Sequence, residues 1–197
     1  AWLTVETELT NLTGFAVRGT LVGHIGNGIA IRLPVTLRAG ERRKIRITPD
    51  EVRGLHVHNP RLWWCNNMGK PEMYDLSLRF EIGNELCDDD KVSFGIREVR
   101  DYLTAEGYRG YTLNGRKVLI RGAGWTDDIF IRDTPERYRH QIEMVRDMHL
   151  NTIRLESIWG NTDDLFDLCD RNGILMFAGW SCQWEWAQYV GGSKEDK

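Results

Sequence analysis

The chain has 197 residues, of which 41% are hydrophobic and 28% are charged. These proportions are ordinary for a globular protein, and the length allows one large domain or two small ones. The net charge of −3 provides no basic surplus for phosphate contacts, so we expect no nucleic-acid partner. No segment approaches the ~18 consecutive apolar residues of a membrane span, so we expect no membrane partner and no spanning helix.

Residues 1–104 have the pattern of an all-β domain. Short runs rich in Val, Ile, Leu, Thr and aromatic residues alternate apolar and polar positions, and clusters of Gly, Asn, Pro and Asp separate them. The runs are WLTVETELT, AVRGTLVG, IAIRLPVTL, RKIRITP, YDLSLRFEIG and KVSFGIREVR. Each strand then has one inward face, so the pattern predicts a two-layer β-sandwich.

Two charged runs interrupt this pattern. The basic run ERRKIRI, residues 41–47, alternates with apolar residues, so we interpret it as the solvated face of a strand and not as a binding patch. The acidic run CDDDK, residues 87–91, fits an exposed hairpin turn. A calcium-binding loop is the more specific alternative, but the run lacks the spacing of oxygen ligands that such a loop has.

The cysteines and histidines predict no metal or cofactor. No pair of them has the spacing of a zinc site followed by a matching second pair. We therefore expect unpaired or incidentally paired thiols, with one bridge open as an alternative in an oxidising compartment, at Cys65, Cys87, Cys169 and Cys182. The sequon at Asn11 would accept a glycan only in a suitable secretory host.

Beyond residue 107 the period changes. YTLNGRKVLIRGAGW predicts a hairpin around LNGR and then an apolar strand. TPERYRHQIEMVRDMHL predicts a helix with Thr134 as its N-cap and Pro135 in first position. The apolar face of this helix is expected to carry Tyr138, Ile142, Val145 and Met148.

The remaining segments continue the alternation of strands and helices. NTIRLES is a strand; TDDLFDLCDRNG is a helix capped by Thr162 and ended by Gly173; ILMFAGW is a strand. The inward face of that helix should hold Leu165, Phe166, Leu168 and Cys169. Because the strands are apolar runs, we expect parallel strands covered on both sides. The order of about three βα strands in residues 105–197 is typical of a parallel sheet or of a partial (β/α) barrel. Three strands and two helices fall short of the eight repeats of a closed barrel, so we expect a truncated domain.

Polar residues follow the carboxyl ends of these strands, where the chemistry of βα folds gathers. They are Asp127 and Asp128 after the first strand, Arg154 and Glu156 on the second, and Trp180 on the third. Carboxylates, a cation and indoles at one edge suit a polyhydroxylated ligand. Each also has an ordinary alternative: Arg154 in a structural ion pair, the aspartates as helix caps or solvated residues, Glu156 as a solvated loop residue, and the tryptophans as packing residues.

The chain resembles a known family at five collinear motifs. They are NPRLWWCNNMGKPEMYDLSLRF, SFGIREV, YTLNGRKVLIRGAGW, NTIRLES and LFDLCDRNGILMFAGWSCQWEW. In order and spacing they are similar to glycoside hydrolase family 2, first its exo-β-D-glucosaminidases and next its β-mannosidases. One departure is Cys65, where the family usually has proline after the paired tryptophans; it bears on a turn and not on chemistry.

The resemblance implies a fold and an activity. Residues 1–104 would be the immunoglobulin-like domain that precedes a TIM barrel, and residues 105–197 the start of that barrel. The family hydrolyses β-glycosides with retention, using an acid/base carboxyl and a nucleophilic carboxyl. Because the family places these carboxyls after later barrel strands, we expect no catalytic residue in this chain and no activity from the fragment alone. The family also implies a periplasmic or secreted location and no cofactor.

The resemblance assigns substrate contacts to four residues. The position of Arg154 lines the sugar subsite, and the carboxylate of Glu156 is the expected counter-charge for a 2-ammonium group of a chitosan-type sugar. Asp127 and Trp180 match further positions of the site. A β-mannosidase and a non-catalytic carbohydrate-binding module stay open as alternatives. An unclosed barrel exposes a strand edge, so we also expect self-association of the fragment.

Overall fold

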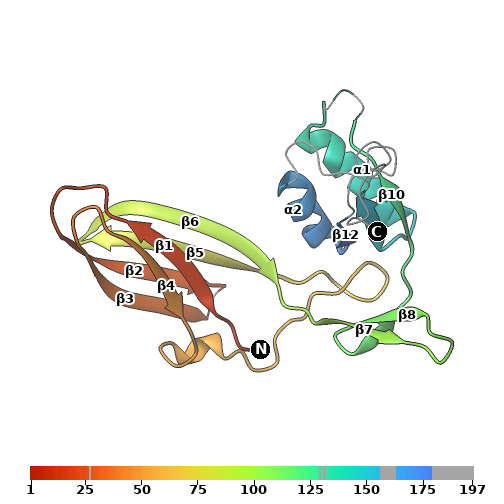
Figure 1. Cartoon of the computed structure of the whole chain (residues 1–197), viewed down its shortest axis with the longest axis horizontal. Coiled ribbons are helices and arrows are strands. Elements are labelled where there is room, and N and C mark those ends of the chain that lie inside the picture. Colours follow the sequence, from red (N-terminus) through yellow and green to blue (C-terminus); the bar gives the residue numbers. More distant parts are fainter. Residues whose placement is uncertain (27, 129, 131, 156–162, 179–197) are drawn as a thin grey trace, which may run out of the picture. The chain divides into compact units, whose positions relative to one another are not determined.

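The computed structural model describes residues 1–26, 28–128, 130, 132–155 and 163–178, and its chain falls into two compact units (Figure 1). Unit 1 consists of Ala1–Arg61 and Met73–Ile96. Unit 2 consists of Leu62–Glu72 and Arg97–Lys197. The chain therefore passes between the units three times. The loop of residues 62–72 groups with unit 2 although both of its ends continue into unit 1.

Unit 1 is built from antiparallel strands in two sheets (Figure 1). One sheet has the order β3-β2-β5-β6 and the other pairs β1 with β4. The strands are β1 Val5–Thr10, β2 Val17–Ile25, β3 Ile29–Leu37, β4 Arg42–Ile47, β5 Met73–Ile82 and β6 Glu85–Gly95, with a 3₁₀ turn at Arg53–Leu55. Buried residues of both sheets form one core, among them Leu21, Ile31, Ile45, Ile47, Leu78 and Phe80. The predicted two-layer arrangement is therefore present.

The basic run lies on β4 and is a solvated strand face, as predicted. Ile45 and Ile47 point into the core, whereas the arginines of β4 are exposed. Across the β1–β4 pair Arg46 contacts Glu6 at 3.1 Å, and Arg42 contacts Glu8. Opposite charges on facing strands explain why an exposed strand can carry so many cations.

The acidic run does not form the hairpin turn that the sequence analysis expected. The turn between β5 and β6 lies at residues 83–84, where Gly83 has a φ of +61°. The three aspartates, Asp88–Asp90, belong to β6 and pair with residues of β5. β6 is an edge strand of its sheet, and charges on an edge strand discourage pairing with another chain.

Asn11 has a structural role in this fold. Its side chain is buried, and its amide nitrogen donates to the carbonyl oxygens of Phe15 and Arg38, each at 2.8 Å. Its amide oxygen accepts from the backbone N–H of Thr13 at 3.0 Å. The nitrogen to which a glycan would be attached is therefore used inside the folded chain.

Unit 2 contains two further sheets and two helices. The antiparallel sheet consists of β7 Val99–Leu103, β8 Arg109–Leu113 and β9 Arg116–Val118. Asn114 and Gly115 join β8 to β9 with φ values of +50° and +78°, the backbone of the predicted LNGR hairpin. The parallel sheet has the order β10-β11-β12, and the helices connect its strands: β10 Gly122–Trp125, α1 Pro135–Asp147, β11 Thr152–Leu155, α2 Asp163–Asn172 and β12 Leu175–Phe177.

The cap of α1 is confirmed, and one residue of its expected face is not. The Thr134 hydroxyl accepts from the backbone N–H of Arg137 at 3.2 Å, with Pro135 in first position. Tyr138, Ile142 and Val145 are buried. Met148, expected on the same face, is exposed because the helix ends at Asp147 and the chain turns away. No helix among the described residues has the length and apolar character to cross a membrane.

Helix α2 follows its expected pattern in part. Leu165 and Cys169 are buried against the parallel sheet, and Leu168 is partly buried. Phe166 is 38% exposed, because at 100° per residue it lies to one side of the stripe defined by the other two. Gly173 ends the helix with a φ of +71°, as predicted, while the expected N-cap Thr162 lies outside the described residues.

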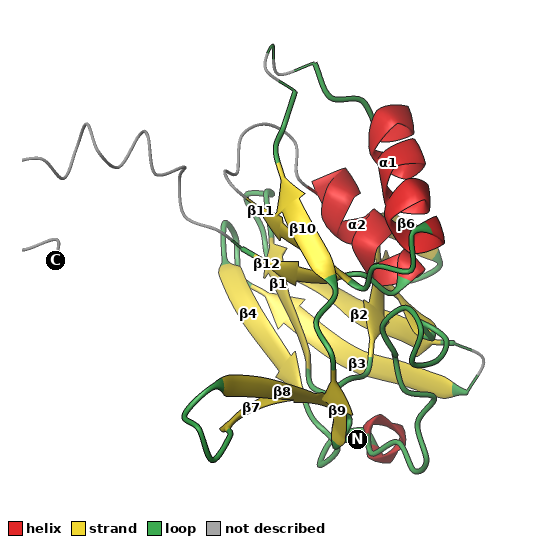
Figure 2. Cartoon of the chain, turned by 90° about the vertical axis from the view of Figure 1, so that its right-hand side faces the viewer, coloured by secondary structure: helices red, strands yellow, loops and turns green. Residues whose placement is uncertain are grey.

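The parallel sheet is covered on one face by α1 and α2 (Figure 2). Trp125, Ile153 and Leu155 point toward the helices and are buried. On the other face Gly124, Arg154 and Phe177 are exposed. Thr152, on the same face as Arg154, is buried, so the described residues cover this second face only in part.

Candidate functional site

Arg154 lies at the centre of the parallel sheet, near the carboxyl end of β11. In the strand register it stands between Gly124 of β10 and Phe177 of β12. Direct neighbours in adjacent strands point to the same face. The guanidinium therefore projects from the open face, with no side chain from Gly124 beside it and an aromatic ring on the other flank. The predicted role of Arg154 as a substrate contact requires such a position on an exposed face, and that role stays a prediction.

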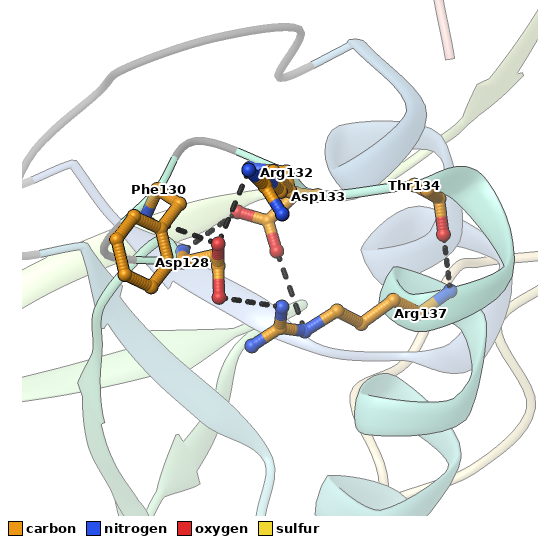
Figure 3. A network of polar contacts seen from close by, with 6 residues as sticks. All are labelled: Asp128, Phe130, Arg132, Asp133, Thr134 and Arg137. Carbon is orange, nitrogen blue, oxygen red and sulfur yellow. Dashed lines mark hydrogen bonds and ion pairs between the residues drawn. The ribbon is translucent and has the colours of Figure 1, made fainter.

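Strand β10 is followed by the two aspartates that the sequence analysis expects at the same edge of the sheet as Arg154. Asp127 and Asp128 follow β10 and are both half-buried. Asp128 is the centre of a polar network that spans the connection from β10 to α1 (Figure 3). The backbone N–H groups of Phe130 and Arg132 donate to one of its oxygens, at 3.1 and 3.3 Å.

Arg137 closes this network from the first turn of α1 (Figure 3). Its guanidinium lies 2.7 Å from Asp128 and 3.5 Å from Asp133. Asp133 in turn accepts from the backbone N–H of Asp128 at 2.8 Å, and its side chain is only 8% exposed. The hydrogen bond from Arg137 holds the pKa of the Asp128 carboxyl below its usual range. The loop is therefore braced by an ionised carboxylate.

Asp128 does not cap the helix, because Thr134 is the N-cap of α1. Three donors occupy its oxygens, so its role in the fold is to organise the loop that carries Asp127. The sequence analysis did not assign roles to Asp133 and Arg137. Their spacing of four residues across the helix start was the available signal, because an acid there can pair with a basic residue in the first turn.

Two aromatic side chains pack against each other next to the loop between β10 and α1. The Trp125 ring is buried beside Tyr138, with centroids 6.2 Å apart. Burial raises the pKa of the Tyr138 hydroxyl. The indole N–H of Trp125 has no hydrogen-bond acceptor among the described residues. The aromatic pair thus supports the end of β10 from the helix side of the sheet.

Two of the four residues predicted to contact substrate fall outside this description. Glu156 and Trp180 lie among residues 156–162 and 179–197, which the structure does not describe. Their roles stay predictions, as do those of Arg154 and Asp127. The structure brings the strand ends that carry Arg154 and Asp127 next to each other through the β10–β11 pairing.

The described cysteines are unpaired and offer no reactive thiol in the core. Cys65 and Cys169 are buried and Cys87 is exposed, while Cys182 lies outside the described residues. Burial raises the pKa of the Cys169 thiol to about 12, so this group stays protonated at neutral pH. In the described ranges no cluster of three or more His, Cys, Asp or Glu side chains could hold a metal ion.

Unit 2 also contains a cavity of about 430 Å³ beside β12 and α2. Its lining is mainly apolar and includes Val99, Tyr111, Ile120, Phe166 and Phe177. Arg97 and Asp170, paired at 3.0 Å, contribute the charged part of the lining. The sequence analysis did not anticipate this hollow, because its walls come from segments that are far apart in the chain.

The sequence of unit 1 matches a known family. Residues 1–97 match the family model described as glycosyl hydrolases family 2. Curated relatives match the rest of the chain as well. The chain belongs to glycosyl hydrolases family 2.

Among these relatives, an exo-β-D-glucosaminidase of Streptomyces avermitilis is 38% identical over 97% of this chain and 21% of its own length. A mannosylglycoprotein endo-β-mannosidase of Lilium longiflorum is 32% identical over 62% of this chain and 13% of its own length. The crystal structure of the Amycolatopsis orientalis exo-chitosanase is similar with a TM-score of 0.81 and 34% identity, over 97% of this chain and 22% of that one. The chain thus spans about a fifth of the length of the glucosaminidase and the exo-chitosanase.

Proposed function

We propose that this chain is part of a retaining, exo-acting β-glycosidase, an exo-β-D-glucosaminidase that removes sugar units from chitosan-type oligosaccharides. One observation carries the proposal: 38% identity over 97% of the chain to a protein named exo-β-D-glucosaminidase. The similarity to an exo-chitosanase structure, with a TM-score of 0.81, also supports it.

The proposal assigns a barrel start to unit 2 and an immunoglobulin-like domain to the region before it. Three features support the barrel: the parallel β10–β11–β12 sheet, the two crossover helices, and the open face on which Arg154 lies. In a closed barrel, that face would be the interior. The apolar cavity beside β12 also fits a sheet that continues past this strand.

Within the whole enzyme, the residues of this chain would bind the sugar and would not cut the bond. Arg154 has the placement of a hydrogen-bond donor at the strand ends, and Asp127 lies on the neighbouring loop. On sequence grounds Glu156 is the anionic partner of the 2-ammonium group, and Trp180 is an aromatic wall of the same subsite. The two carboxyls of retaining hydrolysis, which stand about 5–5.5 Å apart in such enzymes, would come from other parts of the protein.

The test compares amino and neutral sugars in the whole enzyme that carries this chain. Glu156→Gln should lower kcat/KM on a p-nitrophenyl β-D-glucosaminide selectively, by about 1.5–3 kcal/mol for a lost hydrogen bond to a charged group. On the matching β-D-glucoside the change should be much smaller. Glu136→Gln, on the exposed surface of α1, is the matched control and should leave both rates unchanged. An equal loss on both sugars would contradict ammonium recognition.

The similarity to an endo-β-mannosidase favours a second candidate function, a β-mannosidase. A panel of aryl β-glycosides separates the two candidates in the same protein. Preference for the β-mannoside over the β-glucosaminide would replace the first proposal. A secreted or periplasmic location is part of the proposal for either activity, and fractionation of the producing cells would test it.

The chain by itself should neither hydrolyse nor tightly bind these sugars. Calorimetry of the chain with glucosamine oligomers tests the remaining alternative, a non-catalytic carbohydrate-binding module, which tight binding would favour. The exposed edge strand β12 and the apolar cavity beside it predict association of the fragment. Sedimentation that shows only a monomer, together with a sharp unfolding transition, would argue against that prediction.

A further inference from the structure

The loop of residues 62–72 is part of unit 2 although unit 1 holds both of its ends. Within the loop, Trp63 bridges to Pro71, and the backbone N–H of Trp64 donates to the Lys70 carbonyl at 3.0 Å. These contacts shape the loop as a narrow hairpin-like excursion. Trp63 at the base of the excursion is completely buried, as is Cys65, whereas Asn67 and Gly69 near its tip are exposed.

Trp63 attaches the loop to the end of α2. Its indole N–H donates to the carbonyl oxygen of Asp170 at 2.6 Å. The guanidinium of Arg97 lies over the indole ring, 4.2 Å from its centroid, and pairs with the Asp170 carboxylate at 3.0 Å. The ring is thus held on one face by a cation and at its edge by a helix carbonyl.

Asn66 and Asn67 attach the same loop to the end of α1. The Asn66 side-chain amide donates to the carbonyl oxygens of Arg146 and Leu150, at 3.0 and 2.8 Å. The Asn67 amide donates to the carbonyl oxygen of His149 at 2.9 Å. The two amides thus add hydrogen bonds to carbonyl oxygens at and just after the end of α1, where the Arg146 oxygen also accepts from the backbone N–H of His149.

Gly173 allows the end of α2 to approach the loop of residues 62–72 closely. The backbone N–H of Asn66 donates to the Gly173 carbonyl at 2.7 Å. A Cβ at Gly173 would stand 2.9 Å from the Asn66 nitrogen and 3.0 Å from the Trp64 carbonyl oxygen. Both neighbours are backbone atoms that cannot rotate away. Only glycine allows this close approach.

Both helix ends that the loop holds lead directly into strands of the parallel sheet. Asn151 follows α1, is buried, accepts from the Arg121 N–H at 2.9 Å and donates to the Leu119 carbonyl at 2.9 Å. The N–H of Leu175, which begins β12, donates to the Asn151 carbonyl at 2.8 Å. The loop therefore fixes the points from which β11 and β12 start.

Unit 1 fixes the two ends of the loop. The backbone N–H of Arg61 donates to the Tyr74 hydroxyl at 2.8 Å, and the Arg61 guanidinium lies 5.0 Å from the Tyr74 ring centroid. Tyr74 belongs to β5, which follows the loop directly. The residues before and after the loop are therefore joined to each other inside unit 1, and this closure lowers the entropy of the loop only while unit 1 is folded.

We propose that residues 62–72 form an intramolecular clip that makes the native packing of α1, α2 and the parallel sheet conditional on the folding of unit 1. Unit 1 closes the clip, and the clip caps both helices at their carboxyl ends. Unfolding of unit 1 opens the clip and raises the free energy of the native arrangement in unit 2. The inference concerns folding and stands independently of the proposed enzymatic activity.

Amide hydrogen exchange of the whole chain, in four variants, tests this coupling. Leu21→Ala, in the core of unit 1 and remote in sequence from the loop, should speed exchange in β2 and β5 by about 100-fold. Through the clip it should also speed exchange in α1 and α2, by at least about tenfold. In an Asn66→Ala background, the same Leu21→Ala change should leave α1 and α2 within about twofold of that background.

Two further variants separate coupling from simple destabilisation. Ile142→Val weakens the core of unit 2 without touching the loop, and this background should keep the response of α1 and α2 to Leu21→Ala. Asn67→Gly removes the side-chain amide at a φ of +69°, which glycine adopts without strain. It should reduce the response of α1 and α2 to Leu21→Ala, and it replaces Asn66→Ala if that variant does not fold. Absence of any response of α1 and α2 in the chain with its native clip overturns the proposal. An undiminished response in Asn66→Ala and Asn67→Gly overturns it as well.

Discussion

The two units differ in where their stabilising contacts come from along the chain. In unit 1 the strand pairs, both the hairpin β2–β3 and the more distant pair β2–β5, join segments of unit 1 itself, and one core lies between two antiparallel sheets. In unit 2 the βαβ segments are also consecutive, but their helix ends are held by a loop inserted from another part of the chain. The hydrogen bond from Trp63 to Asp170 spans 107 residues.

This difference shows that the consecutive βαβ segments of unit 2 do not by themselves supply all the contacts that hold its sheet and helices. The parallel sheet buries one face against its helices and leaves Arg154 and Phe177 exposed on the other. Parallel sheets are normally covered on both faces. Unit 2 therefore has exposed side chains on one face of its sheet, and the ends of its helices are held by residues 62–72, which lie outside its β-α-β-α-β run.

The largest expected effect is the loss of the buried indole that joins the loop to α2. Trp63→Ala should lower the free energy of unfolding by about 3–5 kcal/mol, because it leaves a cavity and an unsatisfied Asp170 carbonyl. Trp2→Ala is the control, since Trp2 is 72% exposed, and should change stability by less than about 0.5 kcal/mol. Urea unfolding followed by circular dichroism measures the free energy of unfolding of both variants. Similar losses would contradict the claim that Trp63 joins the loop to α2.

The next effect separates a backbone clash from backbone strain alone. Gly173→Ala places a methyl group against two backbone atoms of the loop at a positive φ, and should cost clearly more than the about 1–3 kcal/mol of strain. Gly115→Ala, at a φ of +78° with no atom within 4 Å, should cost only the strain. Thermal unfolding of the two variants gives the comparison. Equal costs would mean that the loop does not press against Gly173.

A smaller effect concerns pH and the loop between β10 and α1. Since Arg137 lowers the pKa of Asp128 in the folded chain, the carboxylate contributes stability above the unfolded-state pKa of about 4. That contribution is lost as the pH falls through the lower, folded-state pKa. Unfolding free energies measured between neutral and acid pH should therefore fall less steeply in Asp128→Asn than in the unchanged chain. Identical slopes would exclude the network as a source of acid sensitivity.

The smallest effect lies on the surface of unit 1. Arg42→Ala removes the ion pair with Glu8 on the solvated face of β1 and β4, where both groups reach water. Such exposed pairs contribute little to the free energy of unfolding at low salt and less at high salt. Repeating the unfolding at about 1 M salt should bring the variant and the unchanged chain together. A loss that persists at high salt would point to packing by the arginine stem.

Features that depend on neighbouring residues could be predicted from the sequence. The Thr134 cap, the Asn114–Gly115 turn, the glycine end at Gly173 and the alternation of β4 follow from backbone geometry within a few residues. The position of Arg154 at a strand end also followed from the order of strands and helices. These are local consequences of period, capping and turn chemistry.

The tertiary structure alone decided which distant segments meet. The hydrogen bonds from Asn66 to carbonyl oxygens 80 and 84 residues away and the cavity beside β12 have no local pattern. The acidic run became an edge strand because the ladder with β5 continued past the turn. Packing chooses among many sequence-compatible partners, and that choice depends on shape and unsatisfied backbone groups that appear only once the helices and strands are in place.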